Sequence, residues 1–111
     1  MKILIDAHGG DNSPLEPILG ASMAAEKFDC TVCLVGNIRT IKQVARKNGI
    51  NLNGIKLYHA ADAVRMDDPP LSVRSKPNSS LRVGFDLLKK NEVDAFISAG
   101  NTGAVHTGAS L

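Results

Sequence analysis

Three short segments of the sequence carry residue types that bind anions in proteins. In the first, Gly9 and Gly10 follow Asp6 and precede Asp11. Glycines let backbone N–H groups come close to an anion such as phosphate. The two acids would repel a bare phosphate, so we expect them to orient a neighbouring group, such as a substrate hydroxyl or an arginine. A tight turn before a helix would use the same residues.

The second segment covers residues 98–104 and has the sequence Ser-Ala-Gly-Asn-Thr-Gly-Ala. The free N–H groups of a first helical turn, together with the side chains of Asn101 and Thr102, could hold a phosphate or a developing oxyanion. An ordinary helix cap formed by Asn or Thr is the alternative.

The third segment lies between residues 61 and 80 and contains charges of both signs. The paired carboxylates of Asp67 and Asp68 could bind a metal ion or act in acid–base chemistry. No further carboxylate or histidine follows at ligand spacing, so we expect no metal. The cations and hydroxyls that come next form a candidate anion site, although solvated loop charges would give the same pattern. These residues are Arg74, Lys76, Ser79 and Ser80.

The cysteines and most of the histidines are expected to be structural. Cys30 and Cys33 have the spacing of a redox motif, but they lie in an expected strand, where residues three apart face opposite sides of a sheet. His59 and His106 have no carboxylate or serine partner evident in the sequence. His8 is the histidine that lies in a candidate site loop, so it is the one that could touch a ligand.

The elements that must position these segments follow from the apolar pattern. Short apolar runs predict strands at residues 2–6, 30–35, 55–59 and 94–98. Helical spacing predicts a helix after each of the first two strands and another before the fourth, and residues 99–103 turn the chain into a last helix. Residues 78–80, Asn-Ser-Ser, are expected to supply the N-cap of the helix before the fourth strand. The sequence from Ser13 to Glu16 predicts a capping box, followed by an apolar stripe of Leu15, Ile18, Leu19 and Met23.

This alternation of strands and helices predicts an α/β fold with a parallel sheet and helices on both of its faces, a three-layer α/β/α unit. The order of the strands stays open. Ligands of such folds bind at the carboxyl ends of the strands. The loops to inspect are therefore residues 7–13, 61–80 and 98–104.

Length and composition narrow the class of protein. The 111 residues suit one domain, and a net charge of +2 gives no basis for nucleic-acid binding. There is no apolar run long enough to span a membrane and no secretory signal, so we expect a cytoplasmic protein with reduced thiols. The glycine fingerprints of dinucleotide-binding and P-loop proteins are absent, which weakens those hypotheses.

Taken together, the loops resemble those of the bacterial phosphate acyltransferases of the PlsX type. Residues 6–11 are similar to the D-A-M-G-G-D opening of that family, with His8 where the family usually has Met. Residues 66–70, 74–80 and 98–104 are similar to its M-D-D-x-P, R-x-K-x-x-S-S and S-A-G-N-T-G-A signatures, in the same order. The resemblance runs from Lys2 to the last residue.

This resemblance implies the amino-terminal part of a longer enzyme, with the fold of phosphate acetyltransferases and isocitrate dehydrogenases. The enzyme would move a fatty acyl group from acyl carrier protein to inorganic phosphate, and the acyl phosphate would serve phospholipid synthesis. The resemblance also implies a homodimer, no cofactor, and peripheral association with the inner membrane face beside the downstream glycerol-3-phosphate acyltransferase.

For that reaction, donors must hold the phosphate and the tetrahedral oxyanion, and cations must neutralise phosphate or meet the acidic carrier protein. The candidate catalytic residues are Asn101, Thr102 and Asp11. The candidate substrate and phosphate ligands are Gly9, Gly10, Arg74, Lys76, Ser79, Ser80, Ser98 and Gly103.

Two other interpretations stay open. The chain could be a truncated, non-catalytic module that binds acyl carrier protein or dimerises. It could also belong to another α/β enzyme that binds a phosphorylated metabolite, which a nucleotide titration would test.

Overall fold

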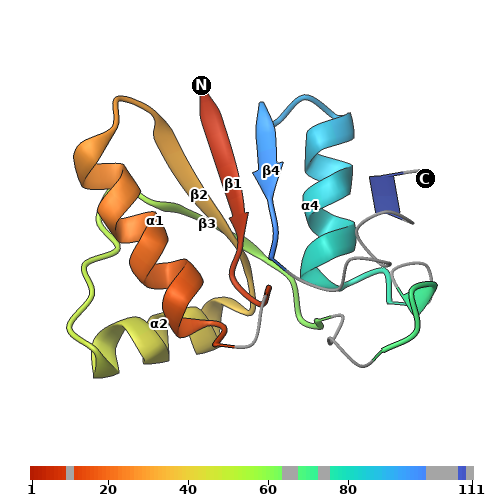
Figure 1. Cartoon of the computed structure of the whole chain (residues 1–111), viewed down its shortest axis with the longest axis horizontal. Coiled ribbons are helices and arrows are strands. Elements are labelled where there is room, and N and C mark those ends of the chain that lie inside the picture. The colour runs from red at the N-terminus through yellow and green to blue at the C-terminus, as the bar shows by residue number, and fades with distance from the viewer. Residues whose placement is uncertain (10–11, 64–67, 73–75, 100–107, 110–111) are drawn as a thin grey trace.

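The computed structural model describes the chain except for residues 10–11, 64–67, 73–75, 100–107 and 110–111 (Figure 1). Its described part contains a sheet of four parallel strands in the order β3-β2-β1-β4. The strands are β1 (Lys2–Asp6), β2 (Thr31–Gly36), β3 (Lys56–His59) and β4 (Ala95–Ile97). The helices are α1 (Leu15–Lys27), α2 (Ile38–Lys47) and α4 (Ser80–Lys89).

The helices cover the two faces of the sheet, so the predicted three-layer α/β fold is confirmed. Helices α1 and α2 lie on one face and α4 lies on the other (Figure 1). Successive residues of β2 point to opposite faces, and each face therefore has its own apolar core. Buried members of the first core include Ile18, Val32, Leu34 and Ile41. Those of the second include Leu4, Cys33, Val35 and Leu87.

The order of the strands places a reversal at β1. The chain runs outward from β1 to β2 and β3, and then returns to add β4 on the other side of β1. Ile5 of β1 stands opposite Leu34 of β2 and opposite Ile97 of β4. In open α/β sheets, ligands bind at such a reversal, outside the carboxyl ends of the strands. The sequence pattern alone could not locate this point.

The start of α1 differs from the prediction. The helix begins at Leu15, and no side chain caps its first turn, so the predicted capping box by Ser13 is wrong. Asn12 takes over part of that role, because its Nδ2 donates to Glu16 Oε1 at 3.3 Å and its carbonyl accepts from the Glu16 N–H at 3.1 Å.

The apolar stripe predicted for α1 is only partly buried. Ile18 is fully buried, whereas Leu15, Leu19 and Met23 are exposed. The helix packs on the sheet through Ile18 and small alanines, of which Ala21 is fully buried. Close packing of a helix on a sheet favours small side chains, so the larger residues lie on the outer flank.

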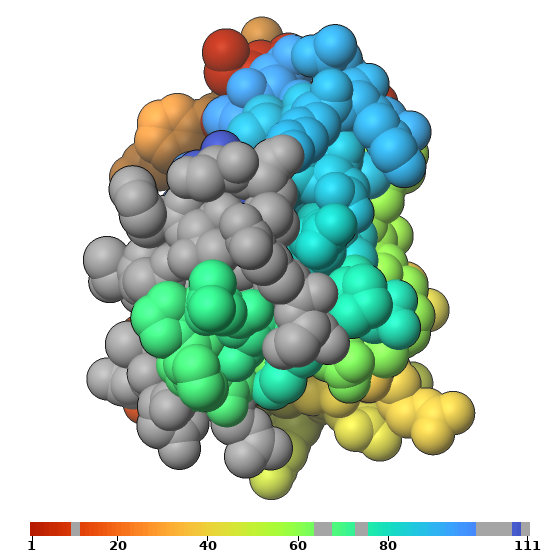
Figure 2. Space-filling view, turned by 90° about the vertical axis from the view of Figure 1, so that its right-hand side faces the viewer, coloured from red at the N-terminus to blue at the C-terminus, as the bar shows by residue number. Residues whose placement is uncertain are grey.

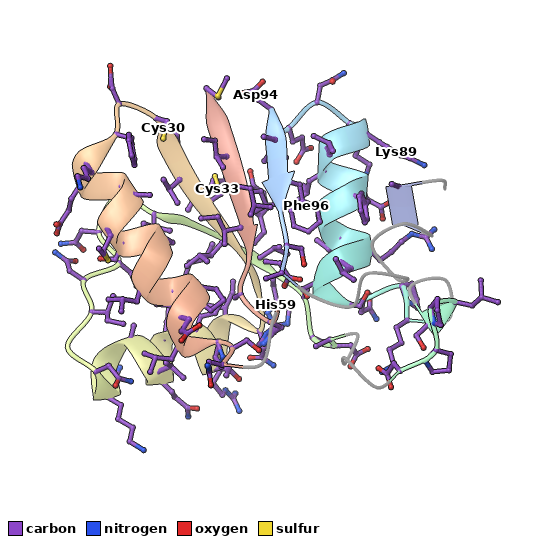
Figure 3. The ribbon with its side chains drawn as sticks, in the orientation of Figure 1. Cys30, Cys33, His59, Lys89, Asp94 and Phe96 are labelled. Carbon is purple, nitrogen blue, oxygen red and sulfur yellow. The ribbon has the colours of Figure 1, made fainter. Side chains whose placement is uncertain are left out.

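The two cysteines face opposite sides of the sheet, as predicted. Cys30 packs against the core under α1, and Cys33 belongs to the core under α4. Both thiols are free, and burial raises the pKa of Cys33. Figure 3 shows Cys30 and Asp94 at the end of the sheet opposite to the end where His59 lies. The cysteines therefore serve as apolar packing groups.

Helix α4 approaches β4 very closely. Its side chain Phe85 meets Phe96 of β4 edge to face, with 5.3 Å between the ring centroids. Figure 3 labels Phe96 on β4, beside α4. Gly84 allows this approach, because a Cβ at that position would collide with the ring of Phe96. Residues 108–109 are helical, and Gly108 lies against the ring of Phe85. In the part of the chain that the structure describes, no helix has the length and apolar character needed to cross a membrane.

Candidate functional site

A cavity opens between the carboxyl ends of β1 and β4, where the strand order reverses. It has a volume of about 270 Å³. One wall comes from the end of β1 and the start of α1, and the other comes from the end of β4. We refer to it as the switch-point pocket, lined by Ile5, Asp6, Gly9, Asn12, Glu16, Pro17, Ile97 and Ala99.

The pocket has an apolar floor because β4 is open on the α1 side of the sheet. Ile97 is 55% exposed there, although its neighbour Ile5 on β1 is half-buried. Helix α1 packs mainly on β2, and it contributes Glu16 and Pro17 to the rim of the pocket. The cavity thus combines an apolar floor with polar groups at its rim, which is typical of sites for small organic ligands.

Asp6 joins the loops that follow β1 and β4. The side chain of this residue is buried, with 3% exposure. Its Oδ1 accepts from the His8 N–H at 2.9 Å, and its Oδ2 accepts from Ser98 Oγ at 2.8 Å. A buried carboxylate needs such donors, because the loss of hydration would otherwise be very costly. Two of the three predicted loops therefore meet at one carboxylate.

His8 connects the first loop to the turn after β2. Its Nε2 accepts from the Asn37 N–H at 2.9 Å, which requires a neutral ring with the proton on Nδ1. Burial lowers the pKa of His8, and the charge of Asp6 opposes this effect only in part. Gly36 permits the contact, because a Cβ there would lie 2.8 Å from Nε2. This histidine therefore holds two loops together.

His59 acts in a similar way from the end of β3. Its Nδ1 accepts from the Ile38 N–H at 3.3 Å, at the start of α2. Asn37 Oδ1 caps the same helix by accepting from the Thr40 N–H at 3.2 Å. Side chains from the loop after β1, the turn after β2 and the end of β3 thus satisfy N–H groups at one helix terminus, where partners inside the helix are lacking. This supports the structural role expected for His59.

The loop between β3 and α4 forms a second cavity of about 350 Å³. Its described lining comes from residues 61–63, Asp68 and Lys76. Lys76 Nζ forms an ion pair with Asp68 Oδ2 at 2.8 Å and donates to the Ala63 carbonyl at 3.3 Å. Residues 69–71 are exposed, on the same side of the molecule as α4 (Figure 2). The predicted ligand Lys76 therefore has an internal counter-ion.

Ser79 and Ser80 are buried at the start of α4. Ser79 Oγ accepts from the Arg82 N–H at 3.2 Å, which makes this serine the N-cap of the helix. A backbone bridge joins Ser79 to Asp62 and ties the two ends of the long loop together. Helix capping by this segment is confirmed, and ligand binding by these serines stays a prediction.

The described residues bring some of the predicted site together. Gly9 lines the switch-point pocket, and Ser98 bonds to Asp6, which also lines it. The predicted ligands Lys76, Ser79 and Ser80 belong to the long loop and the start of α4. Six predicted site residues lie outside the described part of the chain: Gly10, Asp11, Arg74, Asn101, Thr102 and Gly103.

Three polar residues that line this pocket are absent from the predicted site residues: Asp6, Asn12 and Glu16. The sequence predicts that Asp6 orients a neighbouring group and that Glu16 caps a helix, and Asn12 lies in the first candidate loop, so none of them predicts a pocket by itself. The combination of a strand-terminal carboxylate with a glycine-rich turn was the available signal. Among the described residues, no group of three or more His, Cys, Asp or Glu side chains could hold a metal ion.

Comparisons with known proteins match the whole chain. A family model described as "Fatty acid synthesis protein" matches residues 1–111. The chain is 41% identical over 112 residues to a phosphate acyltransferase of Thermoanaerobacterium thermosaccharolyticum, covering 100% of this chain and 32% of that protein. For the phosphate acyltransferase of Thermoanaerobacter pseudethanolicus the identity is 43%, with 100% and 33% covered, and for that of Thermotoga maritima it is 40%, with 99% and 31% covered. The chain thus spans about a third of the length of these curated relatives.

Proposed function

Because this chain belongs to the fatty acid synthesis protein family, we propose that it forms the amino-terminal part of an enzyme that transfers a fatty acyl group from acyl carrier protein to inorganic phosphate. The names of the relatives support the acyltransferase class. The observation that carries the proposal in the structure is the switch-point pocket, because it joins the two loops that resemble the opening and S-A-G-N-T-G-A motifs.

The proposed reaction needs two reactants close together in a partly dry site. An oxygen of phosphate attacks the thioester carbonyl, a C–O bond forms, and the C–S bond then breaks. The leaving thiolate stays on the arm of the carrier protein and takes up a proton from solvent. Since no difficult proton transfer is involved, positioning and oxyanion stabilisation supply most of the acceleration.

The switch-point pocket supplies features that suit this reaction. Its floor of Ile5 and Ile97 can exclude water from one side of a bound thioester. Ala99 lines the pocket, and shortly after it along the sequence come Asn101 and Thr102, the proposed donors to phosphate and to the oxyanion. Arg74 and Lys76 are the proposed cations for phosphate or for acidic groups of the carrier protein. The carrier protein, phosphate and a second copy of the chain are the proposed partners.

The direct test measures acyl phosphate formation from acyl–acyl carrier protein and phosphate by the full-length enzyme. We expect Asn101→Ala to lower kcat by tenfold or more, on the order of the loss of one oxyanion donor. We expect Arg74→Ala to raise the apparent KM for phosphate or for the carrier protein. Matched controls are Asn48→Ala and Arg46→Ala at the end of α2, which should leave both constants unchanged.

The same assay also tests the alternative that the chain is a non-catalytic module that binds acyl carrier protein. The 111-residue chain is compared with the full-length enzyme for turnover and for binding of the carrier protein. Acyl phosphate formation by the full-length enzyme supports the proposal, and its absence with intact carrier-protein binding would instead favour a non-catalytic module.

A further inference from the structure

The most constrained polar group of the described site is the carboxylate of Asp6. It is buried beside the switch-point pocket, and each of its oxygens accepts from a different loop. Oδ1 holds the backbone at His8, and Oδ2 holds the side chain at Ser98. Along the sequence, Asp6 and Ser98 are separated by 92 positions, so this bond is a long-range tie between two strand ends.

The bond also orients the hydroxyl of Ser98. A serine hydroxyl has one proton to donate, and Asp6 takes that proton at 2.8 Å. The position of the Ser98 backbone, from which the loop toward Asn101 departs, is therefore tied to the end of β1.

The same carboxylate indirectly affects the turn after β2. Asp6 holds the backbone of His8, and the ring of His8 accepts from the Asn37 N–H. A change at Asp6 would consequently disturb three strand ends at the carboxyl edge of the sheet. The equivalent carboxylate at the opposite edge, Asp94, accepts only from the Lys2 N–H, at 2.7 Å, among the contacts described.

The geometry points to Asp6 as a positioning residue, which fixes the loop after β1 and the loop after β4 relative to each other at the switch-point pocket. This inference rests on the proposed function for its catalytic consequence. Asp6 does not touch the reacting atoms in this role. It acts through Ser98 and the backbone of His8, so that donors that follow Ser98 meet the substrate in the required place.

The test compares three variants in the full-length enzyme: Asp6→Ala, Asp6→Asn and the control Asp94→Ala. Asp6→Ala removes both acceptors, and we expect kcat to fall by roughly tenfold to a hundredfold, the scale of a small misplacement of reacting groups. In Asp6→Asn, the amide oxygen can accept from His8 and the amide nitrogen can donate to Ser98, so kcat should stay within a few-fold of wild type. Asp94→Ala removes a carboxylate from the same strand pair, and kcat should not change.

A second measurement reports on the tie itself, independently of turnover. Hydrogen exchange of the His8 N–H in the 111-residue chain should become at least tenfold faster in Asp6→Ala and remain unchanged in Asp94→Ala, because only the former loses its acceptor. A double-mutant cycle with Ser98→Ala should show that the effects of Asp6→Ala and Ser98→Ala on kcat are not additive.

The outcomes separate the two hypotheses. If the wild-type enzyme makes no acyl phosphate, the proposed function fails. The hydrogen-exchange rate of the His8 N–H still tests whether Asp6 holds the loop after β1. If the enzyme is active and Asp6→Ala behaves like Asp94→Ala in kcat, the positioning role is overturned. Unchanged exchange at His8 in Asp6→Ala overturns it as well. A loss of kcat in Asp6→Ala that Asp6→Asn largely restores supports the role.

Discussion

Strand β1 has neighbours on both sides, and the two neighbours differ. Strand β2 has six residues, five of which are buried, because it pairs with β1 and β3 and lies between both layers of helices. Strand β4 has three residues, none of which is fully buried, and its described pairing is with β1. One side of β1 is thus a closed core, and the other side is open toward the switch-point pocket.

The difference shows how one sheet supports both stability and a site. On the β2 side, Leu34 fills the core under α1 and α2. On the β4 side, Phe96 packs under α4, but Ile97 on the opposite face is covered by none of the described helices and lines the pocket instead. Because β4 is short and exposed on its α1 side, a ligand can reach the end of β1. The pairing of β1 with the buried strand β2 keeps that end rigid.

The largest expected effect tests the β2 side of β1, where the core is closed. Leu34→Ala should lower the free energy of unfolding by about 3 kcal/mol, because a fully buried leucine leaves a cavity. Ile97→Ala should lower it by less than about 1 kcal/mol, since half of that side chain is already in water. Urea unfolding of both variants measures the difference. Equal losses would mean that β4 is as well packed as β2.

A smaller effect tests the packing of β4 on the face that α4 covers. We expect this face to be tightly packed, in contrast to the open face on the α1 side. Gly84→Ala places a methyl group against the Phe96 ring, and we expect a net loss of about 1–2 kcal/mol after the gain in helix propensity. The matched control is Gly20→Ala in α1, where, apart from neighbouring residues of the helix itself, no described atom lies within 4 Å of the added Cβ. It should stabilise the chain by about 0.5–1 kcal/mol. A stabilising Gly84→Ala in the same thermal or urea unfolding experiment would show that Phe96 can move aside.

The smallest effect concerns pH and the tie between β1 and the turn after β2. The folded pKa of His8 lies below its usual value of 6.5, so the unfolded chain binds more protons between these two values. The contribution of neutral His8 to stability is therefore present above pH 6.5 and is lost as the pH falls through 6.5 to the folded pKa.

The variant His8→Met removes this titration and leaves His59 and His106 in place. The difference in unfolding free energy between wild type and His8→Met, measured from about pH 5 to 8, should shrink as the pH falls. Direct observation of the His8 ring by NMR should give a pKa below 6.5. A constant difference across this range would mean that the neutral ring contributes no pH-dependent stability.

Much of the fold could be predicted because it depends on local pattern. The apolar run at residues 2–6 and the buried Val32 and Leu34 are typical of strands between helices, and the structure confirms the parallel α/β class. Ser79 could be identified as a helix cap from its type and place. Cys30 and Cys33 pack against opposite faces of the sheet, as predicted, although β2 begins at Thr31 and Cys30 lies just before it.

The failures of prediction at α1 have a different origin. The apolar residues of the helix include Leu15, Leu19 and Met23, which are exposed in the structure. The small residue Ala21 faces the sheet instead and lets the helix pack closely on it. Likewise, Asn12 instead of Ser13 interacts with Glu16, because the course of the preceding loop decides which side chain is within reach. The apolar periodicity of the helix predicts neither which of its residues is buried nor which side chain interacts with Glu16.

By itself, the sequence determined the alternation of strands and helices, the cap of α4 at Ser79, and the segments whose residue types could bind an anion. These depend on interactions between residues close along the chain. Only the tertiary structure decided that β4 adds beside β1, that the α1 side of Ile97 stays open, and that Asp6 and Ser98 meet. Those features depend on contacts between residues far apart in sequence, whose geometry is set when the helices pack on the sheet.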